Sequence, residues 1–165
     1  MQKAVFRFTI HSLFIDIYPQ RSPTMECRVT WTDHTTFVAN TGSGHEITMD
    51  GPPDLGGRNL GPRPMEMMLA GAGGCTAFDV VLILQRGRHP ITGCQVEMTA
   101  ERAETEPKVF TKLHLHYIVT GKQLKREAVE RAITLSKDKY CSATAMLGAT
   151  ADITWDLELR EATPQ

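Results

Sequence analysis

The chain has 165 residues, enough for one domain whose core buries roughly 70% of the unfolded surface. Eighteen Lys and Arg against nineteen Asp and Glu give a formal charge of −1, which argues against a dedicated nucleic-acid-binding protein with a basic footprint. Hydrophobic residues make up 41% of the chain and charged residues 22%, so the composition is not that of an intrinsically disordered protein.

Residues 1–24 are expected to be an N-terminal extension to a domain over residues 25–160, which a tail over residues 161–165 follows. Charged residues interrupt the apolar stretches of the extension, and no cleavage site follows it, so it does not match a signal peptide. We therefore expect a cytoplasmic protein. The alternation within residues 6–10 suits a short strand, but we favour a segment that precedes a later start at Met25 and has little structure.

Short alternating runs within residues 26–39 predict a hairpin, and a third strand is expected near residues 45–49. Residues 50–64 hold four prolines and four glycines, which predicts a long loop of the kind that is often functional. Residues 65–86 predict one helix.

The second half of the chain predicts two longer strands over residues 91–104 and 108–120, and an amphipathic helix from 121 to about 137. A short helical stretch over residues 142–148 and a last strand over residues 153–159 follow. Strand runs separated by two dissimilar helices indicate an α+β fold, with a largely antiparallel sheet covering a hydrophobic central helix.

The helix over residues 65–86 is apolar on nearly every face, since Asp79 is the one charged residue between Met67 and Leu84. Such a helix either spans a membrane or lies at the centre of a protein. Its three glycines, its mid-span aspartate and the lack of a second span favour the buried position, so we expect no membrane partner. Each glycine costs up to ~1 kcal/mol, and we expect close approach of an equivalent helix or a substrate in return.

The four cysteines are too few for a disulfide scaffold and too widely spaced for a zinc knuckle. They are Cys27, Cys75, Cys94 and Cys141, and the shortest separation is nineteen residues. Two of them can act together only if the fold brings them together. The pair His114 and His116 on a strand, and the glycines of residues 42–44 and 56–61, match no strong metal or nucleotide pattern. We therefore expect no metal and no cofactor.

Cys75 lies beside two glycines, which leaves the space that a nucleophile needs, although a small buried cysteine is the alternative. Cys141 opens a helical stretch. Cys27 and Cys94 lie in strand patterns and are expected to be packing residues. Asp79 follows Cys75 by one helical turn, where its charge would raise the pKa of the thiol unless a cation neutralises it.

The segment PMEMMLAGAGGCTAFDVV, residues 64–81, resembles the central helix of the OsmC/Ohr superfamily, the osmotically induced and organic hydroperoxide resistance proteins. The segment KYCSA, residues 139–143, resembles the surroundings of that family's second cysteine. The resemblance covers residues 25 to about 159 and is nearest to the YhfA-like subgroup. It implies an OsmC-like fold, with antiparallel sheets around a long buried central helix, in an intertwined homodimer.

The resemblance also implies a thiol-dependent peroxidase that reduces organic hydroperoxides and is regenerated by a cellular dithiol. Cys75 would be the peroxidatic nucleophile and Cys141 the resolving cysteine. Glu66 would help to fix an activating arginine, for which Arg63 and Arg58 are the candidates, with Arg63 nearer the helix. The alternative is a dimeric protein that binds a small hydrophobic ligand or senses redox state, with little peroxidase activity.

Overall fold

The computed structural model describes residues 24–163, and the chain divides into two units between Pro62 and Arg63. The extension predicted for residues 1–24 lies, apart from Thr24, outside the described residues.

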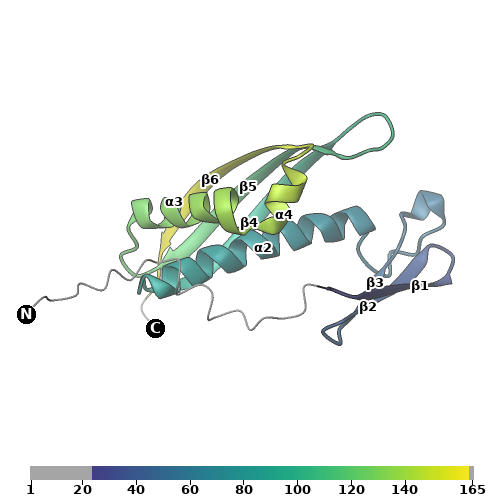
Figure 1. Ribbon diagram of the computed structural model, residues 1–165, viewed down its shortest axis with the longest axis horizontal. Helices are drawn as coiled ribbons and strands as arrows, with labels where there is room; N and C mark the ends of the chain where they lie inside the picture. The colour runs from purple at the N-terminus through teal and green to yellow at the C-terminus, as the bar shows by residue number, and fades with distance from the viewer. Residues whose placement is uncertain (1–23, 164–165) are drawn as a thin grey trace, which may run out of the picture. The chain divides into compact units, whose positions relative to one another are not determined.

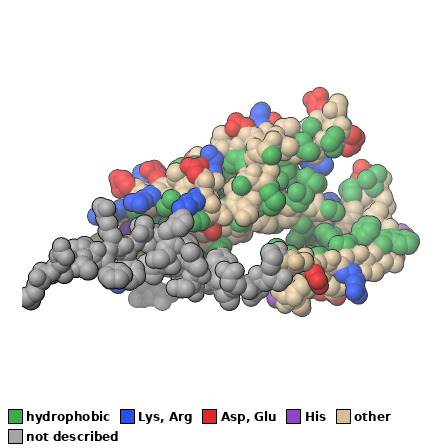
Figure 2. Space-filling model, in the orientation of Figure 1, with side chains coloured by type: hydrophobic (Ala, Val, Ile, Leu, Met, Phe, Trp, Pro, Cys, Tyr) green, Lys and Arg blue, Asp and Glu red, His purple; other side chains and the backbone are tan. Residues whose placement is uncertain are grey.

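The first unit is a three-stranded antiparallel sheet in the order β1-β2-β3 (Figure 1). Its strands are β1 (Cys27–Asp33), β2 (Thr36–Thr41) and β3 (Glu46–Met49), so the predicted hairpin and third strand are confirmed. All seven residues of the edge strand β1 are exposed, among them Trp31 at 63%, and Figure 2 shows hydrophobic side chains at the surface of this unit. The prediction that Cys27 is a packing residue is therefore wrong for the described chain, because nothing covers β1 there.

The loop after β3 contains one short 3-10 turn, η1 (Pro53–Leu55), and is organised by the buried carboxylate of Asp50. Oδ2 accepts from the backbone N–H groups of Arg58 at 2.8 Å and Leu60 at 3.1 Å. Oδ1 accepts from the Gly51 N–H at 2.8 Å and the Thr35 hydroxyl at 2.9 Å. The Leu60 N–H above all, with the other donors, holds the pKa of Asp50 far below its usual range although burial opposes this.

Asp50→Asn is expected to destabilise this unit, because the amide has one acceptor oxygen and turns its NH₂ group toward N–H donors. Since the folded-state pKa of Asp50 is depressed, its stabilisation is fully present above the unfolded pKa of about 3.9 and is lost progressively as the pH falls from there through the lower folded-state pKa. Urea unfolding at pH 7 and pH 3 measures this, followed by tryptophan fluorescence in a Trp155→Phe background that leaves Trp31 as the one tryptophan. The exposed Asp54→Asn in the same loop is the matched control. Equal midpoints for Asp50→Asn and the wild type at pH 7 would contradict the assignment.

The second unit places helices over one face of a three-stranded sheet (Figure 1). Its elements, in chain order, are α2 (Pro64–Arg86), β4 (Ile91–Arg102), β5 (Phe110–Gly121), α3 (Arg126–Leu135), the π-helical turn η2 (Ser136–Tyr140), α4 (Ser142–Leu147) and β6 (Asp152–Glu161). The helix predicted from residue 121 begins at Arg126, because Gly121 still belongs to β5. The last strand reaches Glu161, one residue into the predicted tail.

The sheet has the order β4-β5-β6, and only its β4–β5 pair is antiparallel. β6 pairs with β5 in parallel, the one exception among the described strand pairs to the largely antiparallel α+β fold that we predicted and that the other three pairs confirm. The physical reason is the connection: α3, η2 and α4 carry the chain back along the sheet, as a parallel pair requires.

The core lies between this sheet and the helices. On β5 the residues Leu113, Leu115, Tyr117 and Val119 are all at most 2% exposed, which confirms the predicted alternation. Val129, Ala132 and Ile133 of α3 complete the cluster together with residues of α2.

Helix α2 contributes one buried stripe, Ala72, Thr76, Val80 and Leu84. Its other sides are open within the described chain, since Met68 is 51% and Phe78 is 55% exposed, so one chain alone does not bury the helix all round as its composition predicted. In the described part of the chain, one helix, α2, is long and apolar enough to cross a membrane, with a mean hydropathy of 1.9 over an 18-residue window. The core helices of folded proteins can be equally long and apolar. The buried stripe of α2 packs into the hydrophobic core of the second unit, as the stripe of a core helix does.

The glycines of α2 differ in what lies next to them. A Cβ at Gly73 would lie 2.8 Å from the sulfur of Met98, so this glycine admits β4 rather than an equivalent helix. At Gly71 and Gly74 a Cβ would meet no described atom within 4 Å. These two positions leave open space on the sides of the helix that the chain does not bury.

Candidate active site

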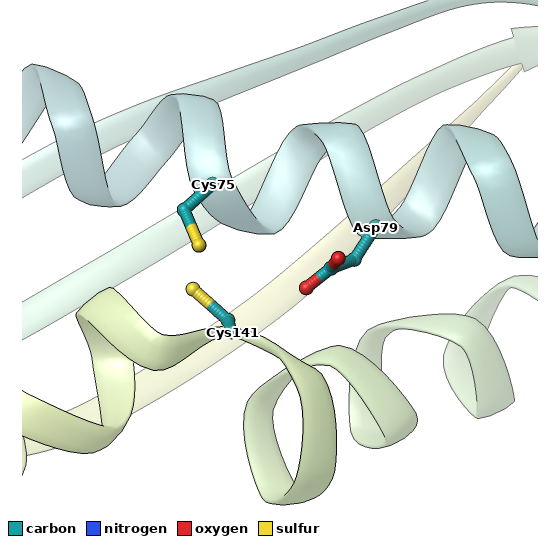
Figure 3. Close-up of side chains that lie close together, drawn as sticks. All are labelled: Cys75, Asp79 and Cys141. Atoms are coloured by element: carbon teal, nitrogen blue, oxygen red, sulfur yellow. The ribbon is translucent and has the colours of Figure 1, made fainter. Parts of the chain in front are cut away.

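The fold brings together two of the four cysteines. The sulfurs of Cys75 and Cys141 and a carboxylate oxygen of Asp79 all lie within 4.8 Å of one another. Cys75 and Asp79 lie one turn apart on α2, and Cys141 lies between η2 and α4, with the sulfurs turned toward each other (Figure 3). Cys94 on β4 packs against the core, as predicted.

Local backbone structure fixes the position of Cys141. Its N–H donates to the carbonyl of Ser136 at 2.8 Å and closes the π-helical turn. The residue then caps α4, since the Thr144 N–H donates to its sulfur at 3.4 Å and the Thr144 hydroxyl donates to its carbonyl at 3.1 Å. Cys141 is 2% exposed, so its thiol faces Cys75 rather than solvent. Such π-helical turns are frequent at functional sites.

A chain of buried hydroxyl groups leads to Asp79. The Ser136 hydroxyl donates to Oδ2 of Asp79 at 3.0 Å, which identifies the hydrogen-bond partner that this half-buried carboxylate needs. Ser136 also bonds with the Thr76 hydroxyl at 2.9 Å, and Thr76 bonds with the Tyr117 hydroxyl at 2.6 Å. Because the Ser136 hydroxyl donates its one hydrogen to Asp79, it can only accept from Thr76. Thr76 therefore donates to Ser136, and Tyr117 donates to Thr76. Burial raises the pKa of Tyr117 to about 12, so it stays a donor at neutral pH.

The sequence indicated Asp79 but not Ser136, which bonds to it, nor Thr76 and Tyr117, which continue the chain of hydroxyl groups. A threonine in an apolar helix and a tyrosine in an apolar strand row were the available signals, since each carries a hydroxyl that needs a buried partner.

The surroundings of Cys75 act on its pKa in both directions. Burial raises the pKa of the thiol most, and the bond with Cys141 and the charge of Asp79 raise it further, which confirms the predicted effect of Asp79. The backbone N–H of Ala143, in the first turn of α4, lowers it. Within the described chain, the contribution that lowers the pKa of Cys75 thus comes from a peptide group. Burial also raises the pKa of Asp79, against the opposing bond from Ser136.

Arg63 and Glu66 lie at the N-terminal end of α2, away from the thiols. The Glu66 carboxylate accepts from the Arg63 backbone N–H at 2.9 Å, which is a helix-capping role. In an α-helix, the separation of nine positions from Glu66 to Cys75 corresponds to a rise of about 13 Å and half a rotation, and the separation of twelve positions from Arg63 to Cys75 corresponds to about 18 Å. Within one chain, neither side chain reaches the Cys75 sulfur. Arg58, in the first unit, pairs with Asp33 at 2.7 Å.

Thr76→Val is expected to lower the free energy of unfolding by about 1–3 kcal/mol, because the valine leaves the buried Tyr117 hydroxyl without its acceptor. Tyr117→Phe removes that stranded hydroxyl, so the double variant is expected to lose less than the sum of the two single variants. Urea denaturation of the three variants measures the coupling. Additive losses would show that the two hydroxyls do not depend on each other.

Comparison with known proteins places these residues in a family context. The family model described as "OsmC-like protein" matches residues 56–156, which include Cys75, Asp79 and Cys141. Protein YhfA of Escherichia coli strain K12 is 47% identical over 135 residues, covering 82% of this chain and 98% of YhfA. A solved structure from structural genomics is 46% identical with a TM-score of 0.76, covering 84% of this chain and 100% of its own. The crystal structure of an organic hydroperoxide resistance protein OsmC from Legionella pneumophila shares the fold, with a TM-score of 0.65 at 16% identity over 84% of this chain and 99% of its own.

Proposed function

The chain belongs to the OsmC-like family, and from this premise we propose that it is a thiol-dependent peroxidase that reduces organic hydroperoxides in oxidative-stress defence. The observation that carries the proposal is the pair Cys75 and Cys141, whose sulfurs lie within 4.8 Å of each other although the residues are far apart in sequence. The fold is shared with a Legionella pneumophila protein named for organic hydroperoxide resistance, and we extend that substrate class to this chain because of the thiol pair.

In the proposed reaction the Cys75 thiolate attacks the terminal oxygen of the hydroperoxide and breaks the O–O bond. The alkoxide leaves and takes up a proton to become the alcohol, and Cys75 becomes a sulfenic acid. The Cys141 sulfur then attacks the sulfenic sulfur, so that a disulfide forms and water leaves. A cellular dithiol reduces this disulfide by exchange and is itself oxidised to a disulfide, which closes the cycle without a cofactor. We place this cycle in the cytoplasm, where thiol systems keep cysteines reduced.

Accessibility supports Cys75, rather than Cys141, as the nucleophile. Cys141 is 2% exposed, whereas Cys75 is half-buried next to the open position at Gly74. Phe78, three residues after Cys75 on α2, is 55% exposed and offers an apolar surface near the thiol. Such a surface favours a hydroperoxide with an organic group over hydrogen peroxide.

The test is turnover by the reduced full-length protein, with cumene hydroperoxide as substrate and dithiothreitol as the dithiol. Cumyl alcohol is expected to form catalytically, with a higher kcat/KM for cumene hydroperoxide than for hydrogen peroxide. Absence of turnover by the wild type would sink the peroxidase proposal.

We assign Arg63 and Glu66 to the site of the other subunit in an intertwined homodimer. The support is that neither residue can reach Cys75 in its own chain, while the exposed sides of α2 leave room for a second copy. Glu66 would then orient the arginine that stabilises the thiolate across the interface.

Coexpression of Arg63→Ala chains with Cys75→Ser chains is expected to restore activity that neither variant has alone. A mixed dimer combines an intact Cys75 on one chain with an intact Arg63 on the other, so random mixing returns about a quarter of the wild-type turnover. Arg58→Ala in place of Arg63→Ala is the matched control and is expected to be active by itself. Mixed dimers as inactive as the two parent variants would rule out the cross-subunit assignment.

One observation favours the alternative function of ligand binding or redox sensing. A groove of about 410 Å³ lies between α2 and β4, on the side of the helix that faces away from Cys75. Mostly small and apolar residues line it, including Leu69, Ala77 and Met98. A wild-type protein that forms one disulfide with stoichiometric hydroperoxide, but shows no turnover with excess dithiol, would support this alternative over the peroxidase.

A further inference from the structure

Cys75, Cys141 and Asp79 present three donor atoms to one small space (Figure 3). All three atoms lie within 4.8 Å of one another. Zinc binds thiolate sulfur at about 2.3 Å and carboxylate oxygen at about 2.1 Å, so donors around a tetrahedral zinc ion lie about 3.5–4 Å apart. Small side-chain rotations bridge the difference. We propose that the reduced site binds one zinc-type divalent cation through the Cys75 sulfur, the Cys141 sulfur and one oxygen of Asp79.

The chemistry of the donors selects the class of metal. Two sulfurs and one carboxylate oxygen form a borderline-soft set, which suits zinc, cobalt and cadmium and does not suit magnesium or calcium. As the metal binds, each thiol gives its proton to solvent and binds as thiolate. Three protein ligands leave the fourth tetrahedral position to water.

The charge and burial of the site also favour a cation. Cys141 is buried and Cys75 and Asp79 are half-buried, so negative charge there is poorly solvated. The hydrogen-bond partner of Asp79 is the neutral hydroxyl of Ser136, which orients Oδ2 and leaves the other carboxylate oxygen available. A bound divalent cation would supply the countercharge, and Ser136 would hold the ligating carboxylate as outer hydrogen-bond partners of metal sites do.

Metal binding would regulate the proposed peroxidase, a consequence that rests on the proposed function although the binding itself does not. A cation bound by both sulfurs uses the electron pair with which Cys75 would attack the hydroperoxide. It also keeps the Cys141 sulfur from attacking the sulfenic acid of Cys75. Conversely, two thiolates, one hydroperoxide and two protons yield the disulfide, one alcohol and one water, and the cation is released because the disulfide does not ligate it.

The test is an anaerobic titration of the reduced full-length protein with Co²⁺, in which the sulfur-to-cobalt charge-transfer absorption measures binding. One Co²⁺ per chain is expected to saturate the band, and Zn²⁺ is expected to displace it. Cys75→Ser and Cys141→Ser are each expected to lose most of the band, whereas the matched controls Cys27→Ser and Cys94→Ser keep it. Ser136→Ala is expected to weaken zinc affinity by about 10–100-fold, while circular dichroism confirms that each variant is folded.

A reduced wild type without a charge-transfer band would overturn the metal site, as would a band that survives in both Cys75→Ser and Cys141→Ser. Turnover of cumene hydroperoxide, measured separately with and without Zn²⁺ and EDTA, keeps the two proposals apart. Cobalt binding at these residues without turnover sustains the metal site and contradicts the peroxidase. Turnover without cobalt binding sustains the peroxidase and contradicts the metal site.

Discussion

Cys75→Ser is expected to lower kcat/KM for cumene hydroperoxide by a factor of at least about 1,000, because a serine hydroxyl is almost wholly protonated at neutral pH and is not oxidised by peroxide. The substitution changes little else, since Cys75 is half-buried on α2 and serine is nearly the same size. Steady-state peroxide consumption measures the effect.

Cys94→Ser is the matched control for this variant. Cys94 is also half-buried, but it lies on β4, packs against the core and does not belong to the group of donors formed by Cys75, Asp79 and Cys141. We expect Cys94→Ser to stay within a few-fold of wild-type activity. Comparable activity in Cys75→Ser and Cys94→Ser would mean that the nucleophile has been misassigned.

Cys141→Ser is expected to keep the first reaction with hydroperoxide but to lose steady-state turnover by at least about 100-fold at low dithiol, because no neighbouring thiol resolves the sulfenic acid. With excess cumene hydroperoxide, Cys75 should then gain a second oxygen and become a sulfinic acid, which dithiols do not reduce. Stopped-flow measurement of the first turnover and intact mass of the product report the two effects. Unchanged turnover at low dithiol, with no gain of a second oxygen, would show that Cys141 is not the resolving thiol.

The order and type of the elements could be predicted because their patterns are local. The alternation of β5 and the continuous apolar run of α2 both correspond to elements with nearly the predicted bounds. The direction of β6 could not be predicted, because a strand pattern shows which residues share a face but not which way the neighbouring strand runs. Cys27 shows the same limit, since its strand forms as predicted but nothing described covers it.

The thiol pair was predicted by resemblance and Asp79 by helical spacing, whereas the hydroxyl chain was not predicted. Thr76 and Tyr117 are 41 residues apart, and Thr76 and Ser136 are 60 apart, so their bonds exist only after α2, β5 and η2 have packed together. The π-helical turn that aims Cys141 at Cys75 likewise depends on a backbone bond from Cys141 to Ser136, which residue propensities do not reveal. The sequence therefore predicted the three residues that lie together better than the residues that position them.

The most direct test of the central claim is to map the disulfide formed when the reduced protein meets one equivalent of cumene hydroperoxide. Nonreducing peptide mass spectrometry is expected to find Cys75 joined to Cys141 of the same chain, as their separation of less than 4.8 Å between sulfurs allows. A disulfide that involves Cys27 or Cys94, or oxidised Cys75 with no bond to Cys141, would contradict the account.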